Sequence, residues 1–461
     1  MAAPRVVIVG AGPAGTRAAE LLVAAGLRPL LVDEARTSGG QIYRRQPEGF
    51  RRDARALYGT EASRATAVHA AFDALAGRID HWPGTLAWNV RNGELFVVRD
   101  ETAHVLPFDA LILATGATDR LLPLPGWTLP GVFSLGGAQI ALKAQACAIG
   151  SRVVFLGSGP LLYLVAAQYV KAGADVAAVL DTAPPGARWR GLPDMAARPS
   201  LLLKGAALLW KLRRAGVEVR RGVVPRRLLS DAGGMRVAGI ALARPDGTEE
   251  VIACDAAGLG WHLRAESQLA DLAGCSFAFD AEHRQWLPLV DTDGRSDVPG
   301  IYLAGDGARL LGADGAEIAG RLAALAALHD LGLPTPSGIS AATLHRRRRT
   351  MDRFRRGLTK AFPWPVELLA GLPDDTLVCR CEAITAGTLR EGATRLDAPE
   401  VNRAKAFTRV GMGRCQGRFC GLAGAEIVAA ARAVPLEQAG RLRGAAPVKP
   451  LPIAATLDDA A

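Results

Sequence analysis

The sequence predicts an α/β protein in which two Rossmann-like dinucleotide-binding domains precede a small C-terminal module that carries cysteines. Two observations predict the first part. A strand, a glycine-rich turn, a helix and a second strand follow one another from residue 5, and the same layout returns from residue 152. A third observation predicts the module, since four of the seven cysteines lie between residues 379 and 420. The length of 461 residues agrees with several domains rather than one core.

Composition limits the class of protein. Hydrophobic residues make up 49% and charged residues 22%, which excludes wholesale disorder and is typical of a soluble globular chain. No secretory signal opens the chain, and two uncharged stretches, 121–142 and 153–170, are broken by prolines or glycines that disfavour a membrane-spanning helix. We therefore expect a cytoplasmic protein whose free cysteines serve metal or redox chemistry.

The first strand, at 5–9, runs into a glycine motif with the full GxGxxG spacing. Gly10 permits a tight turn, Gly12 lets the backbone approach a pyrophosphate, and Gly15 lets the following helix pack on the strand. Ala14 lies in the same turn, where the helix N-terminus faces the phosphate charge. The motif predicts a phosphate-binding site. The alternative is a glycine-rich turn in a fold that binds no ligand.

An acidic pair follows the next strand. A helix is expected at 16–25, and the strand 29–32 then leads into Asp33 and Glu34. Asp33 falls where an acid should bind the adenosine ribose hydroxyls, with Glu34 as its neighbour. Strand, turn, helix and acid together predict that the first site binds an ADP-like moiety.

Three further motifs favour FAD over NAD at this site. They are Gly40 and Gln41 in the loop 39–41, Thr115 and Gly116 at the end of a strand, and Gly305 and Asp306 before a late helix. Together they resemble the motifs of the flavoprotein reductases with two dinucleotide domains, the glutathione and thioredoxin reductase-like group, over about residues 1–335. The resemblance implies that Asp306 binds the ribityl chain of FAD.

The second glycine motif is incomplete. A strand at 152–156 leads to Gly157 and Gly159, which are the candidate cofactor residues of this domain. Leu162 stands where the third glycine is expected, and its side chain lies where strand and helix should touch closely. A nucleotide is still allowed, but Leu162 weighs against NAD(P)H binding.

Four cysteines form two close pairs separated by 33 residues, and they can supply four thiolates to one centre. Arg380, Arg414 and Arg418 lie beside them, where positive charge would offset the negative charge of a 2Fe–2S cluster and raise its potential. The alternatives are zinc, which more often takes CxxC spacing, and unligated thiols. The predicted metal ligands are Cys379, Cys381, Cys415 and Cys420.

The terminal motif resembles a known module. Cys379-Arg380-Cys381-Glu382, with the run 411–421, is similar to the 2Fe–2S domain of bacterioferritin-associated ferredoxin (BFD-like). The chain combines the two glycine motifs with this module after them, and over nearly its whole length it resembles one family. That family comprises the A subunits of opine oxidases, the cluster-bearing subunit of hydrogen cyanide synthase, and the α subunits of heteromeric proline and hydroxyproline dehydrogenases. Some related subunits bind another adenine nucleotide in place of FAD at the first site.

The resemblance implies an electron-transfer, nucleotide-binding subunit of a flavin-dependent amine or amino-acid dehydrogenase. A separate flavoprotein subunit, similar to D-amino-acid and sarcosine oxidases, would oxidise an opine, proline-type, glycine or D-amino-acid substrate. Electrons would then pass through flavin, including FMN at a subunit interface, and through the cluster to a quinone or other carrier, which could place the complex at the inner membrane. Two alternatives remain: a self-contained NAD(P)H-dependent flavin and iron–sulfur reductase, and a non-enzymatic iron- or redox-sensing protein.

No residue set predicts substrate chemistry on this chain, so no catalytic residue is assigned. The redox-active cysteine pair of the reductases is missing, and His262 is expected to be structural or exposed. Three residues after the Gly-Gly-Gln loop could line a flavin or anion pocket or be surface groups: Tyr43, Arg44 and Arg45. Three isolated cysteines are expected to be buried small hydrophobes: Cys147, Cys254 and Cys275.

Positive charge is concentrated in one segment. Residues 345–360 hold eight Lys or Arg against one Asp, and so account for seven of the chain's ten net positive charges. A solvated helix face is one interpretation, and docking to an acidic partner or a phosphate-bearing cofactor is another. No recognition module or aromatic platform favours nucleic acid.

The motifs divide the chain into five parts. Residues 1–120 and 265–335 are predicted to form a discontinuous FAD- or ADP-binding domain around a second NAD(P)-type domain at 121–264. A basic linker at 336–372 leads to the BFD-like domain at 373–434. The Pro- and Ala-rich tail, 435–461, is expected to be disordered or extended along a partner.

Overall fold

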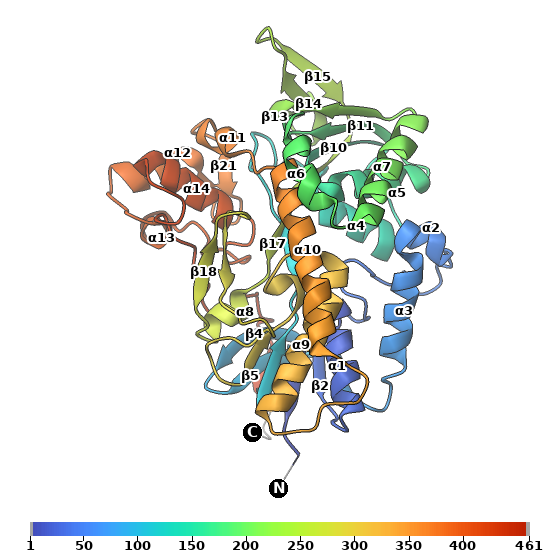
Figure 1. Ribbon diagram of the computed structural model, residues 1–461. Helices are drawn as coiled ribbons and strands as arrows, with labels where there is room; N and C mark the ends of the chain where they lie inside the picture. The colour runs from blue at the N-terminus through green and yellow to red at the C-terminus, as the bar shows by residue number, and fades with distance from the viewer. Residues whose placement is uncertain (1–2, 458–461) are drawn as a thin grey trace.

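Five parallel strands form the sheet of the first domain, in the order β20-β7-β1-β2-β3 (Figure 1). Its central strand is a buried, mostly β-branched run, which suits a strand covered on both faces. The computed structural model describes residues 3–457. The last strand of the sheet follows the second domain in the chain, and it completes the sheet when Ile301 pairs with Leu111. The strands are β1 (Val6–Val9), β2 (Leu30–Asp33), β3 (Asp80–Pro83), β7 (Ala110–Leu113) and β20 (Ile301–Leu303).

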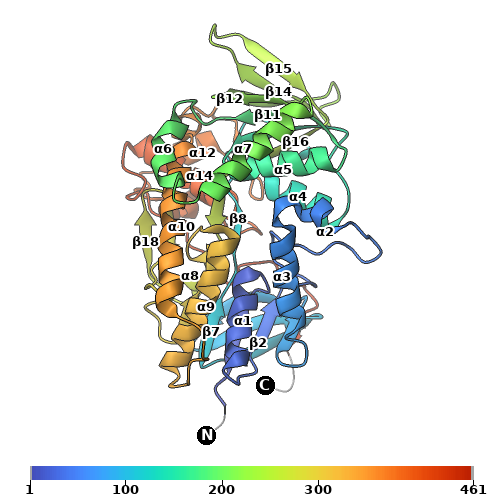
Figure 2. The same ribbon diagram turned by 45° about the vertical axis from the view of Figure 1, so that its right-hand side comes forward.

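Two helices from distant parts of the chain, α1 and α9, lie side by side against this sheet (Figures 1 and 2). They approach so closely that a Cβ on Gly320 would lie 2.0 Å from the Ala14 carbonyl oxygen. A separate antiparallel sheet, β4-β5-β6, extends the domain. These elements are α1 (Pro13–Ala24), α2 (Ala54–Tyr58), η1 (Gly59–Glu61), α3 (Ala62–Asp73), β4 (Leu86–Arg91), β5 (Glu94–Arg99), β6 (Thr102–Pro107), η2 (Gly305–Gly307) and α9 (Gly312–Asp330).

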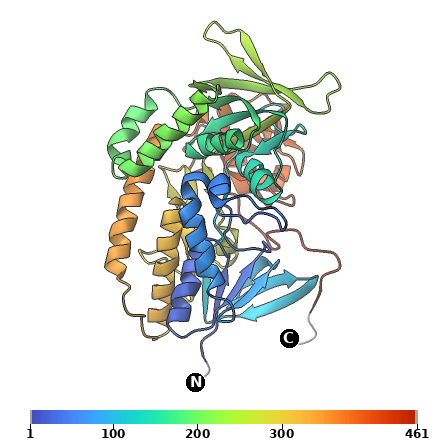
Figure 3. The ribbon, with the colours of Figure 1, turned by 90° about the vertical axis from the view of Figure 1, so that its right-hand side faces the viewer.

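The second domain repeats the layout with the parallel order β12-β11-β10-β16-β9. An antiparallel sheet, β13-β14-β15, projects from it at the top of Figures 1 and 3. Two Rossmann-like units confirm the predicted α/β fold class. The elements are β9 (Val132–Ser134), α4 (Leu135–Ala144), β10 (Arg152–Ser158), α5 (Pro160–Lys171), β11 (Asp175–Asp181), α6 (Ala187–Met195), α7 (Pro199–Arg214), β12 (Glu218–Arg221), β13 (Val224–Ser230), β14 (Val237–Ala243), β15 (Glu249–Ala253) and β16 (Ala256–Trp261).

The basic segment forms one long helix, α10 (Ala341–Ala361), which Ser340 caps by accepting a hydrogen bond from the Thr343 N–H. It runs along both nucleotide-type domains and packs on α6 and α9 (Figure 1). The contact with α6 is close, since a Cβ on Gly191 would lie 2.2 Å from the Gly357 carbonyl oxygen. The predicted linker is therefore a rigid brace.

The cysteine module packs against both nucleotide-type domains (Figure 1). Its buried residues Leu389, Val410 and Ile427 belong to an apolar cluster that continues into the second domain. Short elements of the first domain face it: β8 (Ala117–Asp119), β17 (Leu263–Ala265), α8 (Gln268–Leu272), β18 (Phe277–Asp280) and β19 (Gln285–Pro288). The module itself comprises α11 (Val366–Ala370), β21 (Leu377–Cys379), β22 (Ile384–Thr385), α12 (Ala386–Thr394), α13 (Val401–Thr408) and α14 (Gly421–Arg432).

The tail after α14 returns to the first domain in an extended path. Its first anchor is Asp271, which accepts hydrogen bonds from Arg441. Its second is Val448, which is buried and donates its N–H to the Trp88 carbonyl. Its third is β23 (Thr456–Leu457), which pairs with β6. The tail is thus extended, as one alternative expected, but along its own chain. Among residues 3–457, no helix is long and apolar enough to cross a bilayer.

Candidate functional site

The first glycine turn has the shape that a pyrophosphate requires. A Cβ on Gly15 would lie 1.8 Å from the Gly10 carbonyl oxygen, and one on Gly40 would lie 2.9 Å from the Gly12 Cα. Only glycine backbones can therefore meet at this point. The N-terminus of α1 has no side-chain cap, so its first N–H groups stay free for a phosphate. The glycine turn, together with Ala14 in the first turn of α1, fits the diphosphate of FAD or another adenine nucleotide.

The two acids after β2 differ in their surroundings. Both carboxylate oxygens of Asp33 accept backbone hydrogen bonds, one from the Ala11 N–H and one, at 2.6 Å, from the Ala35 N–H. Burial raises the pKa of Asp33. Glu34 is exposed and pairs with Lys449 of the tail. Both oxygens of Asp33 are thus engaged by the backbone, one of them at the glycine turn. The exposed carboxylate of Glu34 accepts from one side chain, that of Lys449, and so has an oxygen available for ribose hydroxyls.

The late motif lies beside the first glycine turn. Asp306 is half-buried, and its Oδ1 accepts hydrogen bonds from the Leu311 N–H at 2.9 Å and the Gly312 N–H at 2.8 Å. Gly305 packs against Ala14 of the first turn. Arg355 of α10 faces the Asp306 carboxylate, and its buried Nε has no hydrogen-bond partner. Arg355 belongs to the basic segment 345–360, and the structure places this one of its cations beside the late motif.

A buried ion pair joins the loop at Thr115 and Gly116 to the cysteine module. Thr115 donates its hydroxyl to the Glu266 carbonyl at 2.5 Å, and the Glu266 N–H donates to the Gly116 carbonyl at 3.0 Å. The Glu266 carboxylate accepts two hydrogen bonds from Arg418, at 2.8 and 3.1 Å, and Arg264 lies 3.6 Å away. Burial alone would raise the pKa of Glu266, but Arg264 and Arg418 hold it below its usual value. We call these three residues the Glu266 junction.

The Glu266 junction touches the cysteine loop directly, because Arg418 also donates to the Cys415 carbonyl at 3.2 Å and to the Val448 carbonyl at 2.6 Å. One guanidinium thus binds the strand end of the nucleotide domain, the cysteine loop and the tail. Glu266 could not be found from a local motif, since 152 residues separate it from Arg418.

The four predicted ligands lie as two adjacent pairs. Cys379 and Cys420 share a side-chain hydrogen bond, and so do Cys381 and Cys415. Within residues 3–457, no group of three or more Cys, His, Asp or Glu side chains is arranged to hold a single metal ion. Two pairs of thiolates are instead the set that two irons of a 2Fe–2S cluster take, one pair to each iron.

The surroundings favour the thiolate at Cys379, whereas burial raises the pKa of Cys381 and the hydrogen bond to Cys379 raises the pKa of Cys420. A hydrogen bond from Cys420, opposed by burial and assisted by the N–H groups of Gly411 and Glu382, lowers the pKa of Cys379 to about 5. Gly413 passes so close to Cys381 that a Cβ there would lie 2.2 Å from the cysteine Cβ. These contacts bring backbone donors to the sulfurs, as a cluster requires.

The three neighbouring arginines have separate roles. Arg418 belongs to the Glu266 junction, whereas Arg380 lies over the rings of Phe419, at 4.8 Å, and Trp127, at 5.7 Å. Arg414 is exposed. Of these three arginines, Arg418 is the one that joins the cysteine loop to Glu266 of the first domain.

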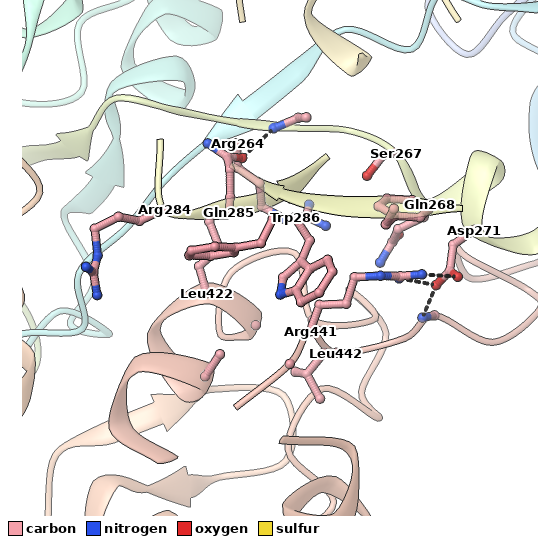
Figure 4. Close-up of a pocket in the computed structure, with 18 of the residues that line it drawn as sticks. Arg264, Ser267, Gln268, Asp271, Arg284, Gln285, Trp286, Leu422, Arg441 and Leu442 are labelled. Atoms are coloured by element: carbon pink, nitrogen blue, oxygen red, sulfur yellow. Dashed lines mark hydrogen bonds and ion pairs between the residues drawn. The ribbon is translucent and has the colours of Figure 1, made fainter. Parts of the chain in front are cut away.

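A pocket lies between the β18–β19 hairpin and the cysteine loop (Figure 4). Gln268 fixes its wall by donating to the Gln416 carbonyl at 2.5 Å, and Arg441 crosses it to form two hydrogen bonds with Asp271, each 2.8 Å. Other labelled lining residues in Figure 4 include Arg264, Arg284, Gln285, Trp286, Leu422 and Leu442. The pocket adjoins the cysteine loop rather than the glycine turn.

The second glycine motif opens onto a filled crevice. Gly157 and Gly159 take backbone angles that favour glycine, but Asp181, the acid after β11, is buried. Asp181 accepts a 2.5 Å hydrogen bond from Tyr163. Phe362, at the end of α10, lies over this edge, and its carbonyl is 2.5 Å from the His262 Nε2. The carboxylate that would bind a nucleotide ribose in this fold is thus already engaged by Tyr163 and Arg188.

Other predicted residues support the loops. Tyr43 is buried, Arg44 donates to the Gln41 Oε1 at 2.7 Å, and Arg45 pairs with Asp73 at 2.6 Å. His262 is half-buried and its ring contacts that of Phe362. Of the three isolated cysteines, Cys254 and Cys275 are buried, as expected. Cys147 is exposed, so the expectation of a buried cysteine is wrong there.

Comparison with known proteins relates the whole chain to redox enzymes. Residues 4–327 match the family described as pyridine nucleotide-disulphide oxidoreductase, and residues 377–430 match the BFD-like [2Fe-2S] binding domain. The chain is 38% identical to the A subunit of opine oxidase from Rhizobium meliloti, over 97% of this chain and 86% of that protein. It is 33% identical to the HcnB subunit of hydrogen cyanide synthase from Pseudomonas aeruginosa, over 98% of each.

Solved structures show the same fold. L-proline dehydrogenase from P. horikoshii aligns with a TM-score of 0.67 and 19% identity, over 98% of this chain and 78% of that chain. Thioredoxin reductase from T. acidophilum aligns with a TM-score of 0.52 and 19% identity, over 71% of this chain and 98% of that chain. The reductase-like part of the predicted fold is therefore confirmed.

Proposed function

This chain belongs to the family of opine oxidase A subunits and the HcnB subunits of hydrogen cyanide synthase, and on that premise we propose that it is the electron-transfer, nucleotide-binding subunit of a heteromeric flavin-dependent amine or amino-acid dehydrogenase. The pyridine nucleotide-disulphide oxidoreductase domain implies FAD, and the BFD-like domain implies a 2Fe–2S cluster. The chain is thus an oxidoreductase subunit. Its donor, partner and acceptor are the proposed part.

The observation that carries the proposal is the Glu266 junction. It fixes the cysteine loop to the strand end that bears Thr115 and Gly116, so the two cofactor positions sit on one rigid unit. When bound, a flavin takes up electrons in pairs and an iron–sulfur cluster passes them on singly. The residues of this chain hold both groups and exclude water between them, since Glu266 and Arg418 are both largely buried.

Substrate oxidation is assigned to a separate polypeptide. The Nε2 of His262 is engaged with the Phe362 carbonyl at 2.5 Å, and no residue set of the described chain was identified that would act on a CH–NH donor. We infer a partner flavoprotein similar to D-amino-acid and sarcosine oxidases, without which this chain does not act on a CH–NH donor. The alpha subunit of sarcosine oxidase from Rhizobium meliloti, 25% identical over 94% of this chain and 40% of that protein, supports an amine-oxidising complex.

The test is anaerobic reduction of the cluster in the complex. The chain would be co-expressed with a flavoprotein subunit similar to D-amino-acid and sarcosine oxidases, and visible absorption would be followed after addition of D-amino acids, glycine, proline-type acids and opines in turn. One class should bleach the cluster in the complex and leave the chain alone unchanged. Substrate oxidation by the isolated chain, at the rate of the complex, would refute the division of labour.

A self-contained NAD(P)H-dependent reductase is the second candidate, and the filled crevice argues against it. Tyr163 and Arg188 already bind Asp181, and Phe362 covers the edge of the sheet. NADH or NADPH should therefore fail to bleach the flavin in stopped-flow measurements. A redox-sensing protein without turnover is the third candidate, and it predicts that removing the cluster leaves the turnover of any complex intact.

A further inference from the structure

Helix α7 exposes an apolar face. Only Leu212 of its 16 residues is buried. Leu203 is 72% exposed and Trp210 is 59% exposed, and the exposed residues Ala206 and Ala207 lie between them. The spacing i, i+3, i+4, i+7 places all four on one face of the helix. Such a face usually packs on something, and here the described chain covers none of it.

Helix α6 adds to the same surface. Trp189 is 76% exposed and Leu192 is 40% exposed, and three residues connect α6 to α7. From residue 195 to residue 217 the chain has five Lys or Arg and no acid. Two of them pair with acids elsewhere, Arg198 with Asp314 and Lys204 with Glu61, so the remaining positive charge lies at the C-terminal end of α7, at Lys211, Arg213 and Arg214. Tryptophan and basic residues around a narrow apolar stripe are typical of helices that lie in a membrane interface.

Helix α10 continues the surface with a straight row of charge. Five exposed cations recur every three or four residues on one face, over about 21 Å of helix at 1.5 Å per residue. The row meets α6, because Arg353 and Lys360 both pair with Asp194. Helices α6, α7 and α10 face the viewer together in Figure 2. The cations of the row are Arg346, Arg349, Arg353, Arg356 and Lys360.

We propose that this surface, made by the apolar faces of α6 and α7 and the basic row of α10, docks the chain on an anionic lipid bilayer. An acidic protein would have to match the arginines individually with carboxylates, whereas a leaflet offers phosphates along the whole row. A nucleic acid would satisfy the row but leave two exposed tryptophans in water. The lipid surface alone accounts for both the row and the tryptophans.

Docking at the bilayer goes beyond the proposed electron-transfer function, because it adds the place where that transfer occurs. It rests on the proposed function only in one respect: a chain held at the bilayer reaches a lipid-soluble electron acceptor. Vesicle binding itself needs no substrate, partner or turnover. A failure of docking is therefore distinguishable from a failure of the redox assignment.

The test is sedimentation of the full-length protein with lipid vesicles. One set is phosphatidylcholine alone, and the other contains about one quarter phosphatidylglycerol. The protein should sediment only with the anionic set, and high salt should weaken binding. Trp189→Ser with Trp210→Ser, and separately Arg346→Gln with Arg349→Gln and Arg356→Gln, should each weaken binding about tenfold or more.

The control is a matched pair on the projecting β13–β14 edge, Arg226→Gln with Met235→Ser, where Met235 is 70% exposed. It should bind as the unaltered protein does, and cluster absorption should show that every variant is folded. Unchanged vesicle binding by the tryptophan variant or by the arginine variant would overturn the proposal. So would a result in which these variants lose the partner flavoprotein but still bind vesicles, because the surface would then dock a protein.

Discussion

Replacement of Arg418 by methionine tests the Glu266 junction most directly. The pair is largely buried, with 10% of the Arg418 side chain and 12% of the Glu266 side chain exposed. Breaking a buried pair by removing one partner costs about 3–5 kcal/mol. Arg264 remains 3.6 Å from Glu266 and offsets part of the loss, so we expect a decrease of about 2–4 kcal/mol in the free energy of unfolding.

The same substitution should release the cysteine loop, because the hydrogen bond from Arg418 to the Cys415 carbonyl is lost. Urea unfolding followed by tryptophan fluorescence measures the stability, and iron per chain measures the cluster. The added Glu266→Gln change should restore part of the stability, since it removes the buried charge that Arg418→Met leaves unpaired. This restoration separates the ion pair from packing by the arginine stem.

Arg414→Met is the matched control, since Arg414 lies in the same loop but is exposed. It should change stability by less than about 0.5 kcal/mol. If Arg418→Met and Arg414→Met shift the urea midpoint equally, and both keep full iron content, the Glu266 junction does not join the module to the nucleotide domain.

Three further changes probe the separate sites. Gly15→Ala places a Cβ 1.8 Å from the Gly10 carbonyl oxygen, so flavin or adenine nucleotide binding should weaken at least about tenfold in equilibrium titration, while Gly186→Ala, with open space around it, should not alter it. Cys415→Ser should lower iron content and visible absorption, and full retention of both would exclude Cys415 as a ligand. Burial lowers the pKa of His262 to about 3, so the proton binds the unfolded chain first as pH falls below its ordinary value of 6.5. Stability should therefore decline from pH 6.5 towards pH 3, and His262→Gln should flatten that decline. An equal slope in both proteins would contradict the assignment.

Local sequence patterns predict much of this fold. The glycine turn at Gly10–Gly15, the buried strands and the cysteine pairs each depend on a few neighbouring residues, so spacing and residue type are sufficient. The basic segment could be located in the same way. Its length as one helix, and its packing on both domains, could not, because close contacts such as Gly191 with Gly357 join residues far apart in the chain.

The details of the sites depend on distant contacts. Position after the strand could not separate Asp33 from Glu34, since the difference lies in the Ala11 N–H and in Lys449. Leu162 weighs against NAD(P)H at the second motif, but the physical obstacle is Phe362, two hundred residues later. Glu266 carries no motif, and only the folded chain brings it to Arg418.

The discontinuous first sheet also sets the order in which the chain can fold. Strand β7 ends at Leu113, and its neighbour β20 begins only at Ile301, so the whole second domain is synthesised in between. Until then the N–H and C=O groups along one side of β7 have no strand partner, and an unpaired apolar edge of this kind recruits other chains. How fast the inserted domain folds, and so returns Ile301 to Leu111, would then govern how much of the nascent protein escapes aggregation.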